Sequence, residues 1–470
     1  MTAGGVPTDE LVQALGAGNV STEAAELEAR SHDSWPVAVK WARMGRHPHP
    51  AEVVVRPGTA AEVADVLRIA RRARTPVTPW GLGSSVTGQA LPVEGGIVLD
   101  LSRLTGTMAL DEVDLTVTVG AGANAGELED RLNERGYTLN NSPQSLYRSS
   151  VGGWLATLQT GQFSSRYGGI EQLVHGYVVT LADGESIPLR ASPRRAMGPD
   201  LRQLFLGSEG TLGVVTEVTL KVFPRAEHRR FSAYDLPSVQ AGLAAMRETM
   251  ALGLRPFLVR FYDLDEARHA MVDEAYGSPV LFLGTEGVRG VAEAEHAALA
   301  ELVESHGGRA VGPEPVEAWM ARRFDFSTVE RLLDEEGGYA ETVEVAHLWS
   351  RIEPLYDELK AALAPLADEV LGHFSHVYTQ GTSLYLILLG RAGTDPEAEA
   401  RLSAIWETAM GVCLRQGAEL SHHHGGGLAR SRYAAESLGD AHRLLQRIKD
   451  SLDPEGVLNP GKLGLRSSRG

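Results

Sequence analysis

Three consecutive histidines, His422, His423 and His424, are the residues of this sequence whose type and spacing best suit chemistry. Imidazole is a common metal ligand and also transfers protons near neutral pH, so the triplet is compatible with either role. On a strand, His422 and His424 would share one face, and His376 could supply a third metal ligand. The residues alone leave both chemistries open.

Two further polar residues lie in apolar, β-prone stretches. Tyr385 lies within residues 381–388, and Arg260 lies within residues 258–263. A tyrosine on a strand is ordinarily a core or interface residue, and an arginine is ordinarily found at a strand edge on the surface. A buried arginine instead offers a planar fork of donors that suits a phosphate or a carboxylate. The role of both residues therefore depends on where the fold places them.

A first glycine-rich loop, residues 79–88, follows a short β-prone piece and precedes an expected strand. Its backbone N–H groups and the hydroxyls of Ser84, Ser85 and Thr87 form a donor-rich surface that suits a pyrophosphate. A P-loop requires a lysine after its last glycine, and no lysine follows here. Val86 stands at the position where the Gly-x-Gly-x-x-Gly fingerprint requires its third glycine. The loop is therefore neither a P-loop nor a Rossmann fingerprint.

A second stretch, residues 142–185, contains two pairs of adjacent glycines, one after Val151 and one after Tyr167. Paired glycines let a backbone approach a flat or charged ligand closely, because no Cβ intervenes. The spacing predicts a helix over residues 155–163, whose first N–H groups would point at an anion. The alternative interpretation is a tight turn between core elements.

Alternating strands and helices must position these loops. Two short helices are expected within residues 8–30, the second with Ser21 or Thr22 as its N-cap. Apolar periodicity predicts strands over 53–57, 96–100, 115–119, 215–222, 257–262 and 280–285, and helices over 59–73, 125–136, 239–252 and 291–306.

Composition narrows the class of protein. The 470 residues are 43% hydrophobic and 22% charged, which suits a soluble globular enzyme. A net charge of −17 argues against nucleic-acid binding, which requires a basic face. The single cysteine, Cys413, excludes a disulfide framework and a multi-cysteine metal site. No apolar run would span a bilayer and no signal peptide is recognised, so we expect a cytoplasmic protein.

The two glycine-rich stretches occur in the same order in a known flavoprotein family. Together with residues 197–200, 206–216 and 453–462, they resemble the FAD-linked oxidase branch of the vanillyl-alcohol-oxidase superfamily. Within that branch the sequence is most similar to the alkylglycerone-phosphate synthases. The resemblance covers residues 30–465.

The resemblance implies an α+β fold, with a two-part PCMH/VAO-type FAD-binding domain and an α+β cap domain built on an antiparallel sheet. The predicted boundaries are an N-terminal helical segment over 1–45, the FAD-binding domain over 46–224, the cap over 225–438 and a C-terminal return to the FAD-binding domain over 439–470.

The implied cofactor is FAD. The first glycine loop contains no histidine for covalent attachment, so we expect FAD to be held non-covalently. The residues expected to bind it are Pro79, Gly81, Leu82, Gly83, Ser84, Ser85, Gln144, Ser145, Ser150, Gly152, Gly153, Trp154, Tyr167, Gly168, Glu209, Gly210, Gly213, Val214 and Val215.

The resemblance also assigns catalytic residues. The synthases carry a His-His-His-Gly stretch at the matching place, and it serves their active site without a metal. The catalytic residues implied here are Tyr385, His422, His423, His424 and Arg260, with no metal ligand. The D-lactate and glycolate branches instead carry Gly-Asp-Gly-Asn-x-His. Gln380, Ser383 and Tyr385 replace key parts of that pattern, which argues against a metal-dependent 2-hydroxy-acid dehydrogenase.

Some positions depart from the synthase pattern. Counting back from Trp349, the second substrate-binding arginine of the synthases falls at Glu330, whose charge would repel a phosphate. Arg331 is adjacent, and a shift of one position would restore the role. Gln144 stands in place of an aspartate, and Ser150 replaces a threonine but keeps the hydroxyl.

These observations predict an FAD-dependent oxidoreductase that oxidises a small alcohol, amine or hydroxy acid with hydride transfer to flavin N5. The alternative is an alkylglycerone-phosphate synthase, which exchanges an acyl for an alkyl group through a flavin N5 adduct without net redox. A flavin-binding protein without activity is the third hypothesis. The expected partner is a small-molecule substrate, no nucleic acid is expected, and the sequence leaves a homodimer open.

Overall fold

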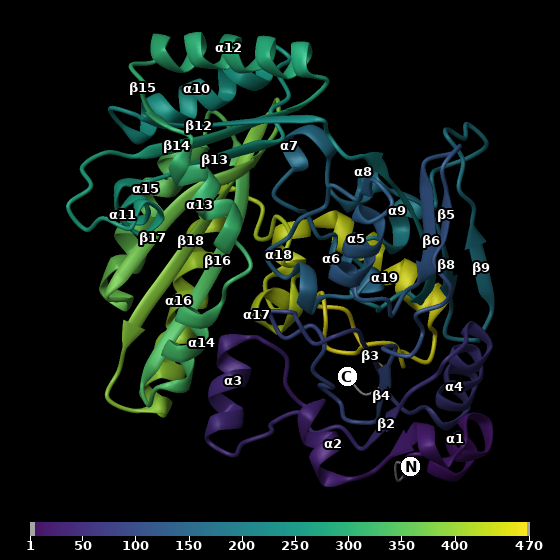
Figure 1. The fold of residues 1–470 in the computed structure, drawn as a ribbon. Helices are drawn as coiled ribbons and strands as arrows, with labels where there is room; N and C mark the ends of the chain where they lie inside the picture. The colour runs from purple at the N-terminus through teal and green to yellow at the C-terminus, as the bar shows by residue number, and fades with distance from the viewer. Residues whose placement is uncertain (1–4, 468–470) are drawn as a thin grey trace.

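A computed structural model describes residues 5–467 of the chain. A large antiparallel sheet with its helices forms one body, and two smaller sheets with their helices form a second body beside it (Figure 1). The fold is α+β, with the two-part FAD-binding region and the separate cap that were predicted. No helix in the described part of the chain has both the length and the apolar character needed to cross a membrane.

The first half of the FAD-binding region is a four-stranded sheet in the order β1-β2-β4-β3. Its strands are β1 (Val20–Ser21), β2 (Val53–Val55), β3 (Val77–Trp80) and β4 (Ile97–Asp100), of which β2, β4 and β3 run parallel. Helix α4 (Ala60–Ala73) packs its apolar side chains against this sheet. The Thr59 hydroxyl accepts the N–H of Glu62, as expected for the predicted N-cap.

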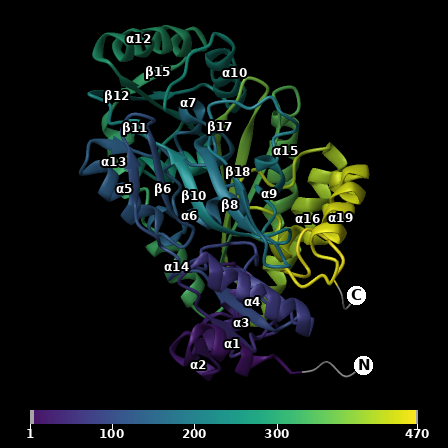
Figure 2. The same cartoon turned by 90° about the vertical axis from the view of Figure 1, so that its right-hand side faces the viewer.

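The second half is a five-stranded antiparallel sheet in the order β5-β6-β10-β8-β9, which Figure 2 shows with its packed helices. Its strands are β5 (Ala109–Asp111), β6 (Thr116–Gly120), β8 (Val174–Thr180), β9 (Ser186–Leu189) and β10 (Val214–Lys221). A short pair joins β7 (Tyr137–Thr138) to β11 (Phe223–Pro224). The helices here are α5 (Ala125–Asn133), α6 (Val151–Thr157), α7 (Ser164–Tyr167), α8 (Ile170–Leu173) and α9 (Arg202–Phe205).

Helix α6 corrects one prediction. It begins at Val151, ahead of the paired glycines, and ends where Leu158 takes a left-handed φ of 53°. Residues 159–163, expected to be helical, lie outside it. The Ser150 hydroxyl caps the helix by accepting the N–H of Gly153, so the helix begins one residue after Ser150.

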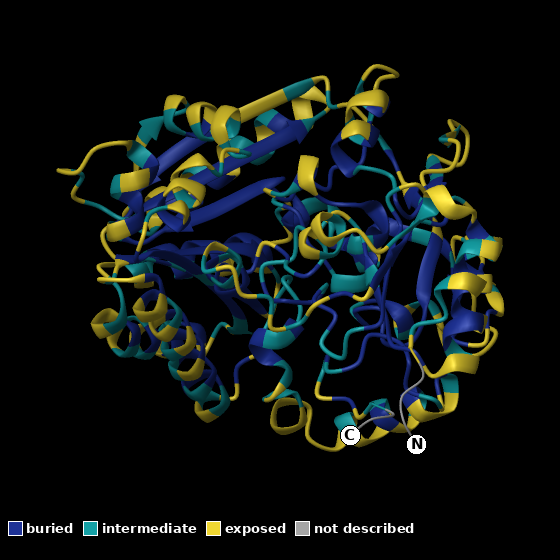
Figure 3. Ribbon diagram, turned by 90° about the horizontal axis from the view of Figure 1, so that it is seen from below, coloured by how far each residue is buried: buried dark blue, intermediate teal, exposed yellow. Residues whose placement is uncertain are grey.

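The cap is a seven-stranded antiparallel sheet in the order β15-β12-β14-β13-β17-β18-β16. Its strands are β12 (His228–Asp235), β13 (Leu258–Tyr262), β14 (Val280–Gly287), β15 (Arg309–Gly312), β16 (Gly338–Leu348), β17 (Glu369–Val377) and β18 (Gly381–Arg391). One face is covered by α10 (Val239–Ala251), α12 (Arg289–Ser305), α15 (Ile352–Leu363) and α16 (Asp395–Gln416), which share one apolar core with it. The sheet strands are buried and the outer helix faces are exposed (Figure 3).

The other face of the cap sheet is turned toward the FAD-binding region. Phe163, from that region, packs in the same apolar cluster as Leu258 and Tyr262 of β13. The remaining cap helices are α11 (Leu264–Met271), α13 (Glu314–Arg322) and α14 (Ser327–Asp334). Because side chains alternate along a strand, Arg260 of β13 shares the inward face with Leu258 and Tyr262.

Both ends of the chain contact distant parts of the fold. The N-terminal helices are α1 (Thr8–Leu15), α2 (Ala24–Ala29) and α3 (Pro36–Arg43), and α3 packs on α14 and α16 of the cap. The N-cap of α2 is Glu23, not the predicted Ser21 or Thr22. After α17 (Gly427–Ser431), α18 (Ala434–Leu438) and α19 (Asp440–Leu452), Asn459 donates its N–H to the carbonyl of Val77 in β3. The last segment therefore joins the first sheet.

Candidate active site

Three inward-facing side chains meet at the centre of the cap sheet. Strand pairing places His373 of β17 directly opposite Tyr385 of β18, and their rings stack with centroids 4.7 Å apart. Arg260 of β13 donates to the Tyr262 hydroxyl at 2.7 Å and to the Gln162 side-chain oxygen at 3.2 Å. Gln162 belongs to the FAD-binding region, so Arg260 spans the interface between the two bodies.

Glu266 of α11 sets the charge around this group. Its carboxylate lies 2.8 Å from His373 Nδ1 and 3.7 Å from an Arg260 nitrogen. Burial and the Arg260 charge lower the pKa of His373 to about 4, despite the opposing effect of Glu266. His373 is therefore neutral at pH 7, and Glu266 offsets the arginine charge.

The histidine triplet forms a turn between α16 and α17, wrapped around one buried carboxylate. The Glu344 side chain of β16 has no exposed surface. Its carboxylate accepts hydrogen bonds from the main-chain N–H groups of His422, His423 and His424, from the Ser421 hydroxyl and from the Arg430 guanidinium. Burial alone would raise the pKa of Glu344, but Arg430 and these donors hold it below its usual value.

His376 completes a cluster with two members of the triplet. It lies at a bulge of β17 with a left-handed φ of 53°, and its Nδ1 is 2.9 Å from the Ser164 hydroxyl. Ring nitrogens of His376, His422 and His423 all lie within 4.8 Å of one another. The expected pairing of His422 with His424 on a strand face is wrong, because the triplet is not a strand. This arrangement can hold a metal ion or pass a proton.

Protonation states follow from burial. Burial lowers the pKa of His422 and of His424 to about 4, and it lowers those of His376 and His423 well below the usual value. These imidazoles are neutral at pH 7 and can accept a proton. Burial raises the pKa of Tyr385, so its hydroxyl stays protonated and can donate. The Tyr385 ring centroid lies 6.0 Å from that of His423 and 5.5 Å from that of His424.

The first glycine loop fits an anionic cofactor. Across the described chain, the backbone N–H groups of residues 81–85 have no hydrogen-bond acceptor. Gly83 has a φ of +70°, and a Cβ at Gly81 would lie 2.3 Å from the Ser150 hydroxyl. Unpaired amides with no side chain between them and the ligand suit the pyrophosphate of FAD.

The second glycine stretch does not offer the free N–H groups that were expected. The amides of Val151, Gly152 and Gly153 donate to Ala123 O, Ala121 O and Ser150 Oγ respectively. A Cβ at Gly152 would lie 2.7 Å from the Cβ of Ala121, so this glycine is required for close packing. Free amides are therefore found in the first loop and not at the start of α6.

The other predicted cofactor residues divide into two groups. Tyr167 donates its hydroxyl to Glu286 of the cap, and Glu209 accepts the N–H groups of Gly426 and Gly427, so both tie the two bodies together. The rest lie in the loops, in the sheets or, for Trp154, in helix α6 of the FAD-binding region: Pro79, Leu82, Ser84, Ser85, Gln144, Ser145, Trp154, Gly168, Gly210, Gly213, Val214 and Val215. Trp154 is a core residue, since it is 1% exposed and donates to Ser149.

Glu330, the position of the missing arginine, lies on α14 and pairs with Arg148 of the FAD-binding region. Both side chains are half exposed. Arg331 is also exposed. This ion pair holds Glu330 at the end of the 3-10 helix Leu146–Arg148 rather than at the histidine cluster.

Sequence reasoning did not assign the residues that hold the cluster in place, namely Glu266, Glu344, His373, Tyr378 and Arg430. His373 and His376 both lie on β17, but a spacing of three predicts opposite faces of a regular strand, and the bulge at His376 is visible only in the structure. Glu344 is 78 residues or more from its hydrogen-bond partners in the triplet, so no local pattern could identify its role.

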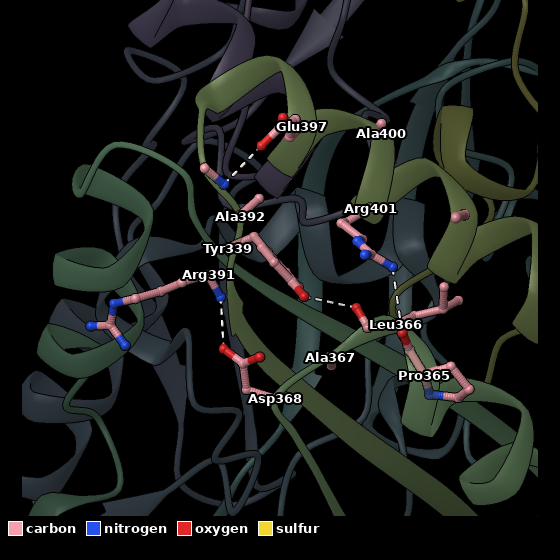
Figure 4. A pocket seen from close by; sticks show the side chains of 12 residues that line it. Tyr339, Pro365, Leu366, Ala367, Asp368, Arg391, Ala392, Glu397, Ala400 and Arg401 are labelled. Carbon is pink, nitrogen blue, oxygen red and sulfur yellow. Dashed lines mark hydrogen bonds between the residues drawn. The ribbon is translucent and has the colours of Figure 1, made fainter.

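Two cavities flank the cap sheet. The larger, of about 660 Å³, lies away from the cluster and is lined by Tyr339, Asp368, Arg391 and Arg401 among others (Figure 4). None of the predicted catalytic residues lines it. The smaller, of about 260 Å³, lies between the two bodies and is lined partly by Tyr378 and His422.

The fold and this site together define a two-body flavin-dependent enzyme, and comparisons with known proteins agree. Residues 51–190 match the family model described as FAD binding domain, and residues 225–463 match FAD linked oxidases, C-terminal domain. The uncharacterized FAD-linked oxidoreductase YgcU of Escherichia coli O157:H7 is 31% identical, with 97% of each chain covered. The chain therefore belongs to the FAD-linked oxidase family and is an FAD-dependent enzyme.

The chain is also similar, at lower identity, to alkyldihydroxyacetonephosphate synthases, both in sequence and in structure. The alkyldihydroxyacetonephosphate synthase of Dictyostelium discoideum is 24% identical, over 90% of this chain and 74% of that protein. A solved structure of an alkyldihydroxyacetonephosphate synthase superposes with a TM-score of 0.81 at 22% identity, over 97% of this chain and 85% of the other. At this identity the superposition shows a shared fold.

Proposed function

We propose that this enzyme oxidises a small alcohol, amine or hydroxy acid. The observation that carries the proposal is the Tyr385 ring, which lies with its centroid 4.7 Å from that of His373, 6.0 Å from that of His423 and 5.5 Å from that of His424. A donor beside an acceptor is the pair needed to hold a substrate oxygen or nitrogen and remove its proton. Hydride acceptance is the chemistry that bound FAD supplies.

Each side chain has a distinct role in this proposal. The Tyr385 hydroxyl donates a hydrogen bond to the substrate heteroatom. A neutral ring nitrogen of His423 or His424 accepts the proton of that heteroatom. Arg260, whose positive charge is balanced by the Glu266 carboxylate, orients a polar end of the substrate next to Gln162. FAD is held without a covalent bond, and the free amides of residues 81–85 bind its pyrophosphate.

A second candidate is the ether-lipid synthase reaction, which exchanges an acyl for an alkyl group. Arg260 favours it, because a buried guanidinium in the site suits a phosphate. The synthase relative favours it as well. The pairing of Glu330 with Arg148 weighs against it, since the second phosphate-binding arginine is then missing.

Anaerobic absorbance of the purified flavoprotein separates the two. Bleaching of the oxidised flavin band by a simple alcohol, amine or hydroxy acid, with recovery in air, is the expected result. No bleaching by any member of a broad panel would contradict the oxidoreductase. Bleaching by acyl-dihydroxyacetone phosphate, reversed by a fatty alcohol without oxygen, would instead support the synthase.

A further inference from the structure

The smaller cavity borders the histidine cluster, because His422 is among the residues that line it. Its volume is about 260 Å³, and both bodies line it. Thr160 and Glu171 come from the FAD-binding region, and Tyr378, Glu419 and His422 come from the cap. Glu419 is exposed, so the cavity opens toward solvent. Its polar lining suits water molecules.

A continuous chain of hydrogen bonds connects this cavity to the cluster. His423 Nδ1 lies 2.9 Å from His422 Nδ1. On the other side of the His422 ring, Nε2 lies 2.7 Å from the Tyr378 hydroxyl. Tyr378 follows the last residue of β17 directly, and it is one of the residues that line the cavity. The three groups therefore form a path from the site to the cavity.

We propose that His422 and Tyr378 conduct a proton that His423 accepts, from the substrate or from reduced flavin as it is oxidised, to the water of this cavity. The proposal rests on the proposed function, because it takes the proton that His423 accepts. His423 passes its Nδ1 proton to His422 Nδ1, and His422 releases its Nε2 proton to the Tyr378 oxygen. Tyr378 releases its own proton to a water molecule. One proton enters, one leaves, and no bond between heavy atoms changes.

The surroundings explain why such a path is needed and where it ends. The His423 ring is packed against the rings of His376, Tyr385, His422 and His424, so the hydrogen-bonded pair of His422 and Tyr378 is the route that connects it to the cavity. At the outer end, the Glu171 carboxylate has one buried oxygen with no hydrogen-bond partner among the described residues. Glu171 and Glu419 give the cavity a negative lining that attracts a hydrated proton.

The test is Tyr378→Phe, which removes the hydroxyl and keeps the ring. The matched control is Tyr339→Phe, because Tyr339 also lines a cavity of the cap and donates its hydroxyl, to Leu366 O (Figure 4). FAD-loaded protein is reduced with one equivalent of dithionite and mixed with excess ferricyanide in weakly buffered solution containing a pH indicator. Each reduced flavin gives two electrons to two ferricyanide ions and releases one proton from the anionic hydroquinone, or two from the neutral form. Absorbance of the flavin and of the indicator then separates electron loss from proton release.

In the wild type and in Tyr339→Phe, the two signals should coincide. In Tyr378→Phe, proton release should lag by about tenfold or more, and imidazole, which fits the cavity, should restore it. Release from the wild type should also slow in D₂O more than flavin oxidation does. The proposal is overturned by coincident signals in Tyr378→Phe, by an equal lag in Tyr339→Phe, or by no isotope effect in the wild type. This experiment uses no substrate, so its outcome does not depend on the panel of alcohols, amines and hydroxy acids. Failure of that panel to reduce the flavin would contradict the proposed function, whereas the outcomes above decide the proton path.

Discussion

The carboxylate of Glu344 should determine both the stability of the histidine turn and its shape. We predict that Glu344→Gln destabilises the protein far more than Glu341→Gln, although both glutamates are fully buried on β16. Glu344 is ionised and pairs with Arg430 at 2.9 Å. Burial raises the pKa of Glu341 to about 8, so it is largely neutral at pH 7. The two substitutions therefore differ mainly in the charge that they remove.

The structure gives the magnitudes. In Glu344→Gln, the Arg430 guanidinium stays 2% exposed without its counter-charge, and three adjacent main-chain N–H groups lose a charged acceptor. Breaking a buried ion pair from one side costs about 3–5 kcal/mol. In Glu341→Gln, one of two donors, Thr342 N or Trp406 Nε1, loses its acceptor, which costs about 1 kcal/mol.

Urea unfolding followed by far-UV circular dichroism, at a fixed FAD concentration and pH 7, measures the free energy of unfolding of both variants. Because the pKa of Glu344 is lowered from 4.5, its contribution is present above that pH and disappears as the pH falls through the lower, folded-state value. The penalty of Glu344→Gln should therefore shrink in acid. Equal free energies for the two variants at pH 7 would refute the role given to Glu344.

Further predictions concern the site and the cofactor loop. Tyr385→Phe should slow flavin reduction by the substrate about 10²-fold in stopped-flow measurements with FAD binding unchanged; an unchanged rate would contradict its role as donor. The difference in unfolding free energy between the wild type and Glu341→Gln should fall as pH rises from about 4.5 to about 8 in urea titrations, because folded Glu341 retains a proton that the unfolded chain loses; a difference independent of pH would contradict a protonated Glu341. Zn²⁺ should inhibit turnover by binding His376, His422 and His423, whereas EDTA should leave activity intact; loss of activity in EDTA would indicate a required metal. Gly81→Val should weaken FAD binding at least tenfold in fluorescence titrations, since its Cβ would lie 2.3 Å from Ser150 Oγ; unchanged affinity would remove this loop from the cofactor site.

Elements governed by neighbouring residues could be predicted from the sequence. Helix α4 begins after the Thr59 cap, and β13, β14 and α10 lie within two residues of their expected bounds. These elements depend on side-chain periodicity and on local capping, and both are set by residues that lie close together in the sequence. The first glycine loop also has the free amides that its composition indicated.

The start of α6 shows where local reasoning fails. The paired glycines indicated an anion-binding helix end, but Ala121 and Ala123 already accept the amides of Val151 and Gly152. Those acceptors lie about thirty residues earlier in the chain and reach the helix only through the packing of the second sheet. A glycine pair can serve close packing as well as ligand binding, and only the tertiary contacts decide between them.

The sequence by itself therefore determined the element types, the loop composition and the kinds of side chain available for chemistry. The tertiary structure alone decided their combination. Strand register opposes His373 to Tyr385, the bulge at His376 turns its ring toward the triplet, and β16 brings Glu344 under a turn that lies 78–80 residues further along the chain. The physical reason is that hydrogen-bond partners and burial, which set the protonation of these groups, arise from contacts between segments that are remote in sequence.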